Sequence, residues 1–76
     1  MGQTDVAANV RAEMARQRRR QSDLADHLGM ARQNVSRRLL GRRPFDTDEL
    51  AKVAEFLGVP ITTFFQAGRE NAEQAS

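Results

Sequence analysis

The chain has 76 residues, of which 39% are hydrophobic and 29% charged, with no cysteine and a formal net charge of +2. A chain this short builds one small core, and without cysteine it has no disulfides, thiolate metal sites or cysteine nucleophiles. No apolar run approaches the roughly 20 residues that cross a bilayer, and no signal-peptide pattern opens the chain, so we expect a cytoplasmic protein.

Charge is divided unevenly along the chain. Residues 1–43 carry ten Arg and four acidic residues, a net charge of +6, whereas residues 44–76 carry two basic and six acidic residues, a net charge of −4. Eleven of the twelve cations are Arg, whose planar fork suits phosphates and guanine edges better than the point charge of Lys. This split favours a polyanionic partner, although a solvated charged face produces the same pattern in many small proteins.

Apolar spacing predicts the first two helices. Apolar residues recur every fourth position from Val6 to Met14, which indicates a helix from about residue 4 or 5 to about 18. Leu24 and Leu28 define a second, brief helix. Gly29 follows directly, where a left-handed C-cap ends a helix.

Three further helices are expected, over about 32–40, 47–57 and 59–66. Val35 and Leu39 mark the buried side of the third helix, and Gly41 ends it. Pro44 places a loop before the fourth helix, which Asp46 or Thr47 caps. We therefore predict an all-α domain of five helices without strands at 1–67, followed by a disordered tail at 68–76.

The third expected helix exposes side chains that can read DNA. Opposite Val35 and Leu39, a helical wheel places amide and guanidinium groups, those of Gln33, Asn34, Arg37 and Arg38. Arg32 stands at the N-terminal end of the helix. Such groups make bidentate hydrogen bonds to guanine O6/N7 and adenine N6/N7, and the major groove admits one α-helix. The sequence "HLGMA" at 27–31 provides a tight turn between the second and third helices, as a helix-turn-helix requires.

Six short sequence elements follow one another at regular places along the expected helices and turns: Gln21, Leu24-Ala25, Gly29, Val35-Ser36, Gly41-Arg42-Arg43 and Leu57-Gly58-Val59. In the order and spacing of these elements, the chain resembles the Cro/CI-type (XRE-like) helix-turn-helix family of phage repressors and bacterial regulators. The resemblance covers about residues 10–65. The resemblance implies a compact five-helix domain whose third helix enters the major groove. It also implies a sequence-specific regulator of transcription, a repressor that binds double-stranded DNA as a homodimer without a cofactor.

The family pattern also assigns site residues. Its base-reading positions match Ala31, Arg32, Gln33 and Arg37. Its contacts to the DNA backbone match Gln21, Arg42 and Arg43, to which we add Arg19, Arg20 and Arg38 as expected phosphate contacts.

The chain departs from the family pattern at two places. Arg19 and Arg20 stand where the family has an apolar residue and a Ser or Thr that caps the second helix. Either Ser22 caps that helix instead, or the first helix runs on through Arg20. Leu40 replaces a polar residue before Gly41, which removes one possible phosphate contact.

The adjacent Phe64 and Phe65 cannot both point into one small core. We expect one to pack under the first and fourth helices and the other, with Ile61 or Phe56, to form an apolar patch. Family members pair through this region, so the expected dimer interface is Ile61, Phe64 and Phe65. The alternative is that the second phenylalanine lies flat on the monomer.

No catalytic or metal site is predicted. Ser22, Asp23 and His27 share one short helix and cannot form a triad, and a single His without Cys provides no zinc set. Two other roles remain open for the same fold: an antitoxin that binds a toxin as well as its operator, or a phage Cro-like or excision accessory protein.

Overall fold

The computed structural model describes residues 5–66, which form four α-helices and one 3-10 helix. In chain order these elements are α1 (Val6–Gln17), α2 (Gln21–Leu28), α3 (Arg32–Leu39), α4 (Thr47–Leu57) and η1 (Ile61–Phe65). Residues 5–66 contain no strand, so the all-α prediction is confirmed for that range. The expected tail at 68–76 and the domain boundary after residue 67 lie outside the described residues.

The prediction of a fifth α-helix is wrong, because η1 is a 3-10 turn of five residues. The Thr63 N–H donates to the Pro60 carbonyl at 2.9 Å, which is the i to i+3 hydrogen bond of a 3-10 helix. Pro60 precedes η1 and the extended Gln66 follows it, so the segment is too short to propagate i to i+4 hydrogen bonds.

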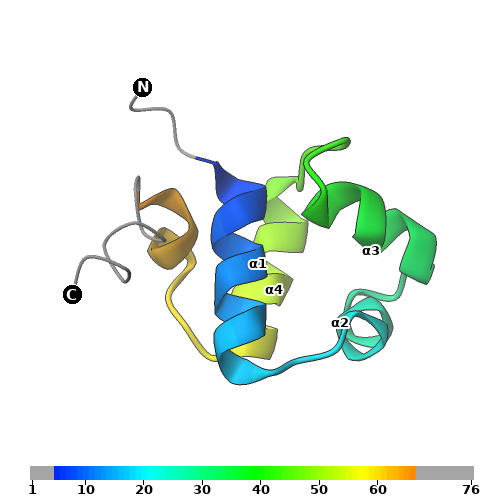
Figure 1. Cartoon of the computed structure of the whole chain (residues 1–76), viewed down its shortest axis with the longest axis horizontal. Coiled ribbons are helices and arrows are strands. Elements are labelled where there is room, and N and C mark those ends of the chain that lie inside the picture. The colour runs from blue at the N-terminus through cyan, green and yellow to red at the C-terminus, as the bar shows by residue number, and fades with distance from the viewer. Residues whose placement is uncertain (1–4, 67–76) are drawn as a thin grey trace.

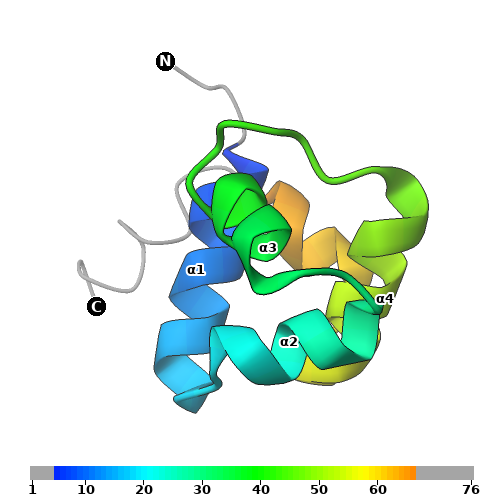
Figure 2. The ribbon, with the colours of Figure 1, turned by 90° about the vertical axis from the view of Figure 1, so that its right-hand side faces the viewer.

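α1 and α4 form the centre of the molecule (Figure 1). α2 and α3 lie on one side of this pair and η1 lies on the other, and Figure 2 looks onto the α2–α3 side. One core joins all five elements, and its larger members are Val10, Met14, Leu24, Leu28, Val35, Leu39, Leu50, Val53, Leu57 and Phe64. α3 and η1 therefore lie on opposite sides of the central pair of helices.

The start of α2 differs from both expected alternatives. α1 ends at Gln17, and Arg18 adopts the left-handed conformation with φ 57°. Arg20 is extended and occupies the N-cap position, so α2 begins at Gln21 and Ser22 lies within its first turn. The left-handed Arg18 stops α1 within one residue of its expected end and before it can run through Arg20, although residues with a Cβ rarely adopt this conformation.

Glycines end α2 and α4 as predicted, with Gly29 and Gly58 both left-handed at φ 68°. α3 ends one residue earlier than expected, at Leu39, with Leu40 as its C-cap and the left-handed Gly41 following.

Two polar side chains of α1, Asn9 and Glu13, are buried and make hydrogen bonds within the protein. Asn9 donates from Nδ2 to the carbonyls of Phe64 at 2.8 Å and Gln66 at 3.2 Å, which fixes η1 against α1. Glu13 is fully buried and accepts hydrogen bonds from Arg16 at 2.6 Å and Gln17 at 2.8 Å. These polar groups satisfy their hydrogen bonds inside the fold, as buried polar groups generally must.

Candidate nucleic-acid interface

A tight turn joins α2 to α3. The Gly29 N–H donates to the Asp26 carbonyl at 3.2 Å, and the Met30 N–H donates to the Ala25 carbonyl at 3.1 Å. Ala31 is extended and serves as the N-cap of α3. A Cβ at position 29 would meet no atom within 4 Å, so the left-handed backbone, rather than lack of space, requires glycine there. Gly29 to Ala31 thus form the turn of a helix-turn-helix.

α3 presents to solvent all four residues that the sequence assigns to base reading. Val35 and Leu39 are 0% and 2% exposed and turn the opposite side of α3 into the core. The exposed residues are Ala31, Arg32, Gln33 and Arg37. Arg37 donates from Nη1 to Asn34 Oδ1 at 3.3 Å, an exposed contact within the same helix. This face therefore offers guanidinium and amide groups to a partner.

The helices differ in how their N-termini are capped. Asp5 caps α1 by accepting from the Ala8 N–H at 3.0 Å, and Asp46 caps α4 by accepting from the Glu49 N–H at 2.7 Å. α2 and α3 have no capping hydrogen bond from a side chain. Uncapped N–H groups and the positive end of the helix dipole suit a phosphate group. The two helices of the helix-turn-helix are thus the two α-helices of the described residues without such a cap.

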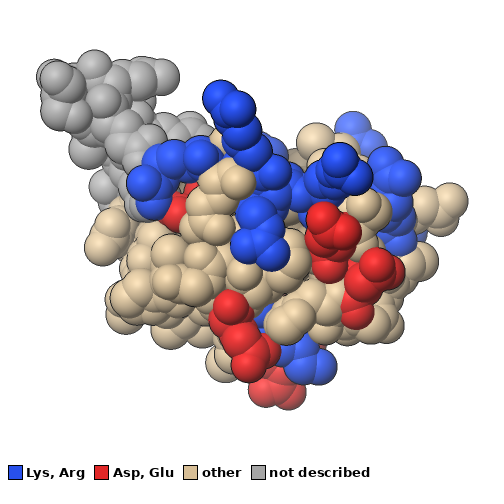
Figure 3. Space-filling model, turned by 90° about the horizontal axis from the view of Figure 1, so that it is seen from below, with Lys and Arg blue, Asp and Glu red and all other residues tan. Residues whose placement is uncertain are grey.

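Basic residues flank the exposed face of α3. Arg20 and Gln21 are exposed at the start of α2, and Arg42 and Arg43 are exposed in the loop that follows α3. Figure 3 shows Lys and Arg side chains in a band along one edge of the molecule, reaching the side that carries α2 and α3. This arrangement brings amide and Arg side chains together with a basic border, as an interface with duplex DNA requires.

A family model for the helix-turn-helix matches residues 10–64, which is more than two thirds of the chain. The chain belongs to the XRE-type helix-turn-helix family, whose members include the Cro/CI-like proteins. This XRE-type protein is a DNA-binding transcriptional regulator. No curated protein and no solved structure matches it.

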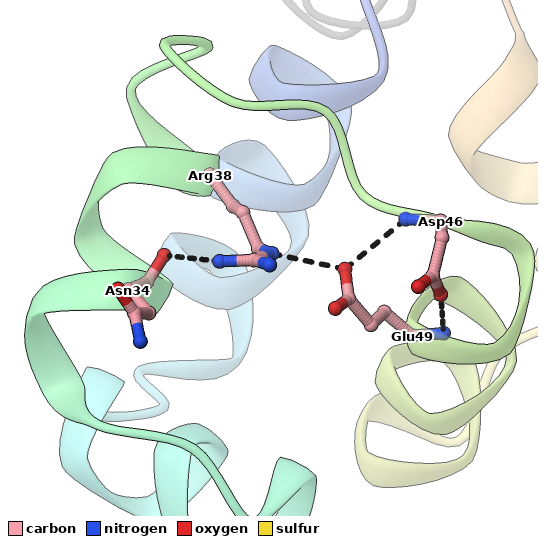
Figure 4. Close-up of polar contacts among 4 residues, drawn as sticks. All are labelled: Asn34, Arg38, Asp46 and Glu49. Atoms are coloured by element: carbon pink, nitrogen blue, oxygen red, sulfur yellow. Dashed lines mark hydrogen bonds and ion pairs between the residues drawn. The ribbon is translucent and has the colours of Figure 1, made fainter.

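Two of the arginines assigned to the DNA backbone make contacts inside this XRE-type regulator. Arg38 donates from Nε to Glu49 Oε1 at 2.9 Å and from Nη1 to the Asn34 carbonyl at 3.1 Å (Figure 4). Arg19 lies over the ring of Phe56, with its guanidinium carbon 3.9 Å from the ring centroid, and donates from Nη1 to the Phe56 carbonyl at 3.1 Å. Both guanidinium groups are thus held by α4 or its C-terminus.

The structure also adds a residue that the sequence did not single out. Arg11 of α1 donates from Nη1 to the Leu39 carbonyl and so binds the C-terminal end of α3. Its position on the exposed side of a predicted amphipathic helix gives no signal of this role, because the contact joins residues 28 positions apart.

The aromatic pair at the end of η1 separates as expected. Phe64 is fully buried in the core, whereas Phe65 is 49% exposed and Ile61 is partly buried. Phe64 therefore does not reach the surface of the protomer, because Asn9 holds its carbonyl and its ring fills the core beside α1 and α4. Of the three residues assigned to a dimer interface, Ile61 and Phe65 remain accessible.

The only histidine of the chain contacts α4. His27 Nε2 lies 3.1 Å from Glu55 Oε1, and its ring centroid lies 5.5 Å from that of Phe56. No group of three or more potential metal ligands occurs within residues 5–66. No helix in the same range is long and apolar enough to span a membrane.

Proposed function

We propose that this regulator binds a specific duplex DNA sequence by inserting α3 into the major groove. The observation that carries the proposal is the exposed face of α3 that bears Gln33 and Arg37 opposite the buried Val35 and Leu39. The exposed Arg32 stands at the N-terminal end of the same helix. Arg pairs with guanine O6 and N7, and Gln pairs with adenine N6 and N7. Ala31 provides an apolar surface at the start of the helix, suited to a thymine methyl group.

Contacts to the DNA backbone fix the register of α3 in this proposal. Arg20 and Gln21 at the start of α2 bind one phosphate region, where the uncapped helix adds its own N–H groups. Arg42 and Arg43 bind a second region from the loop after α3. Phosphate contacts of this kind orient a protein on the duplex without reading its sequence.

Methylation interference at guanine N7 tests the entry of α3 into the major groove. Duplexes are first selected for binding, and guanines of the enriched sequence are then methylated at N7, which lies in the major groove. We expect methylation of at least one guanine in each half-site to abolish binding, because Arg32 or Arg37 can no longer reach that atom. Binding that tolerates methylation at every guanine, while adenine N3 methylation in the minor groove blocks it, would contradict this geometry.

We further propose that the regulator acts as a homodimer and represses transcription by occluding a promoter. The exposed Phe65 and the partly buried Ile61 support a self-association surface on η1. η1 lies on the opposite side of α1 and α4 from α3, so a partner bound at η1 leaves α3 open to DNA (Figure 1). A dimer places two recognition helices about 34 Å apart on an inverted repeat.

Sedimentation equilibrium and a promoter reporter test these two statements. We expect the wild-type chain to sediment as a dimer and Phe65→Ser to sediment as a monomer, with Thr62→Ser as the exposed control on η1. A selected operator placed within a promoter should lower transcription when the protein is present. Increased transcription would contradict repression without contradicting DNA binding.

A further inference from the structure

The pair Arg38–Glu49 joins the recognition helix to α4 across a gap between their backbones. Among the described residues, no Cα atom of α3 lies within 8 Å of a Cα atom of α4. Arg38 Nε and Glu49 Oε1 are 2.9 Å apart and span this separation (Figure 4). The two side chains are only 14% and 17% exposed, so water screens the pair far less than an ion pair on the open surface.

Glu49 is itself held in place by the capping box of α4. Its Oε1 accepts the Asp46 N–H at 3.1 Å in addition to Arg38, and Asp46 accepts the Glu49 N–H at 2.7 Å. The same guanidinium group of Arg38 also donates from Nη1 to the Asn34 carbonyl, one turn earlier in α3. A series of hydrogen bonds therefore links the middle of α3 to the first turn of α4, and both the Arg38 and the Glu49 side chain are held by more than one of them (Figure 4).

These hydrogen bonds lie at the two ends of the loop that carries Arg42 and Arg43. Arg38 precedes this loop and Asp46 follows it, and both donate to one oxygen of Glu49. Beneath the loop lies a groove of about 710 Å³, bordered by Arg38, Pro44, Phe65 and residues of α1 and α4. The Arg42 N–H donates to the Arg37 carbonyl at 2.9 Å, so the start of the loop follows α3, while Phe45 near its end packs against the core. A shift of α3 relative to α4 therefore also moves the start of the basic loop.

We propose that Arg38 is a positioning residue and not a phosphate contact: through Glu49 it sets the placement of α3 and of the following basic loop relative to α4. This inference rests on the proposed function, since it concerns which sequences α3 selects. A rotation of α3 misaligns bidentate pairs with base edges but leaves non-specific phosphate attraction intact. Loss of the pair should thus lower sequence discrimination more than it lowers affinity for DNA in general.

Two variants on opposite sides of the pair distinguish positioning from phosphate contact. Arg38→Met keeps the alkyl stem and removes the guanidinium. Glu49→Gln keeps an oxygen for the Asp46 N–H and removes the charge. Asp48→Asn is the matched control for Glu49, since it removes a carboxylate from the same first turn of α4. Lys52→Met is the control for Arg38, since it removes an exposed cation of α4.

The measurement is affinity for the selected operator and for a random duplex, each at several salt concentrations. We expect Arg38→Met and Glu49→Gln each to reduce the ratio of these affinities about tenfold or more, the loss of about one base-pair contact. Arg38→Met should leave the salt slope unchanged. The double variant should lose no more discrimination than the worse single variant, because both changes break one interaction.

A phosphate contact by Arg38 predicts a different set of results and would overturn the inference. In that case Arg38→Met weakens binding to both duplexes equally and reduces the salt slope by about 0.9 per protomer, while Glu49→Gln behaves as Asp48→Asn. Unchanged discrimination in both variants would overturn it as well. A wild-type chain that selects no sequence would instead overturn the proposed function, and the inference with it.

Thermal unfolding of each variant identifies losses that come from unfolding. Arg38→Lys is the second variant at this position and keeps one donor for Glu49. If Arg38→Met does not fold, Glu49→Gln and Arg38→Lys carry the test. With Glu49 intact, we expect Arg38→Lys to discriminate between the operator and a random duplex better than Arg38→Met does. Combined with Glu49→Gln, Arg38→Lys should give no such gain. Equal discrimination with and without the Glu49 carboxylate contradicts the pairing.

Discussion

The salt dependence of duplex binding measures how many Arg side chains meet phosphates. The proposed backbone contacts include three exposed arginines in each protomer: Arg20, Arg42 and Arg43. Each neutralised phosphate contributes about −0.9 to the slope of log affinity against log salt, so one protomer gives a slope of about −2.7 and a dimer about −5.4. Raising salt from about 50 to about 200 mM then weakens binding about 40-fold for a monomer and about 2,000-fold for a dimer.

Fluorescence anisotropy with a labelled duplex measures this slope directly. Arg42→Ala should reduce its magnitude by about 0.9 for a monomer or about 1.8 for a dimer. Lys52→Ala is the matched control, because it removes an exposed cation from α4 without touching the proposed contacts. A slope near zero would refute the electrostatic reasoning. An equal change in the two variants would refute the assignment of Arg42, since net charge alone would then explain the effect.

Three further predictions concern single positions, and urea unfolding at equilibrium measures all of them. Arg18→Gly should be about 1 kcal/mol more stable than Arg18→Ala, because both remove the charge but only Gly relieves the left-handed strain at φ 57°; equal stability would show that this conformation costs nothing. Arg20→Ser should be about 1 kcal/mol more stable than Arg20→Ala, because the serine hydroxyl can accept a hydrogen bond from a free N–H group in the first turn of α2. Equal stability would mean that the backbone at position 20 does not let a side chain reach that N–H group. Phe64→Ala should lose about 3 to 5 kcal/mol and Phe65→Ala less than about 1, whereas similar losses would contradict their different burial.

Local patterns in the sequence were sufficient to predict most of the fold. Apolar spacing and the terminating glycines placed α2, α3 and α4 within a residue or a few of their observed bounds. These signals depend on neighbouring residues alone, which a sequence displays directly. The same spacing placed the end of α1 at about residue 18, within one residue of Gln17. The left-handed conformation of Arg18 was not predicted, because it is unusual for a residue with a Cβ. The 3-10 geometry of η1 was missed because apolar spacing over five residues does not distinguish it from a short α-helix.

The exposed face of α3 was predictable for the same reason, since a helical wheel places Gln33 and Arg37 opposite Val35 and Leu39. The roles of individual arginines were not. Arg38 meets Glu49 on another helix, and Arg19 meets Phe56 at a sequence separation of 37 residues. Both pairings depend on how the helices pack against one another. From the sequence alone, Arg19 and Arg38 were therefore predicted only as phosphate contacts.

The central claim is that side chains of α3 choose the DNA sequence, and parallel selections from a random duplex pool with wild type and Gln33→Ala test it most directly. At about physiological salt, wild type should enrich an inverted repeat with half-sites about one helical turn apart. Gln33→Ala should enrich the same repeat with one base pair in each half-site relaxed. Binding without enrichment, or an identical sequence logo from both proteins, would contradict the claim.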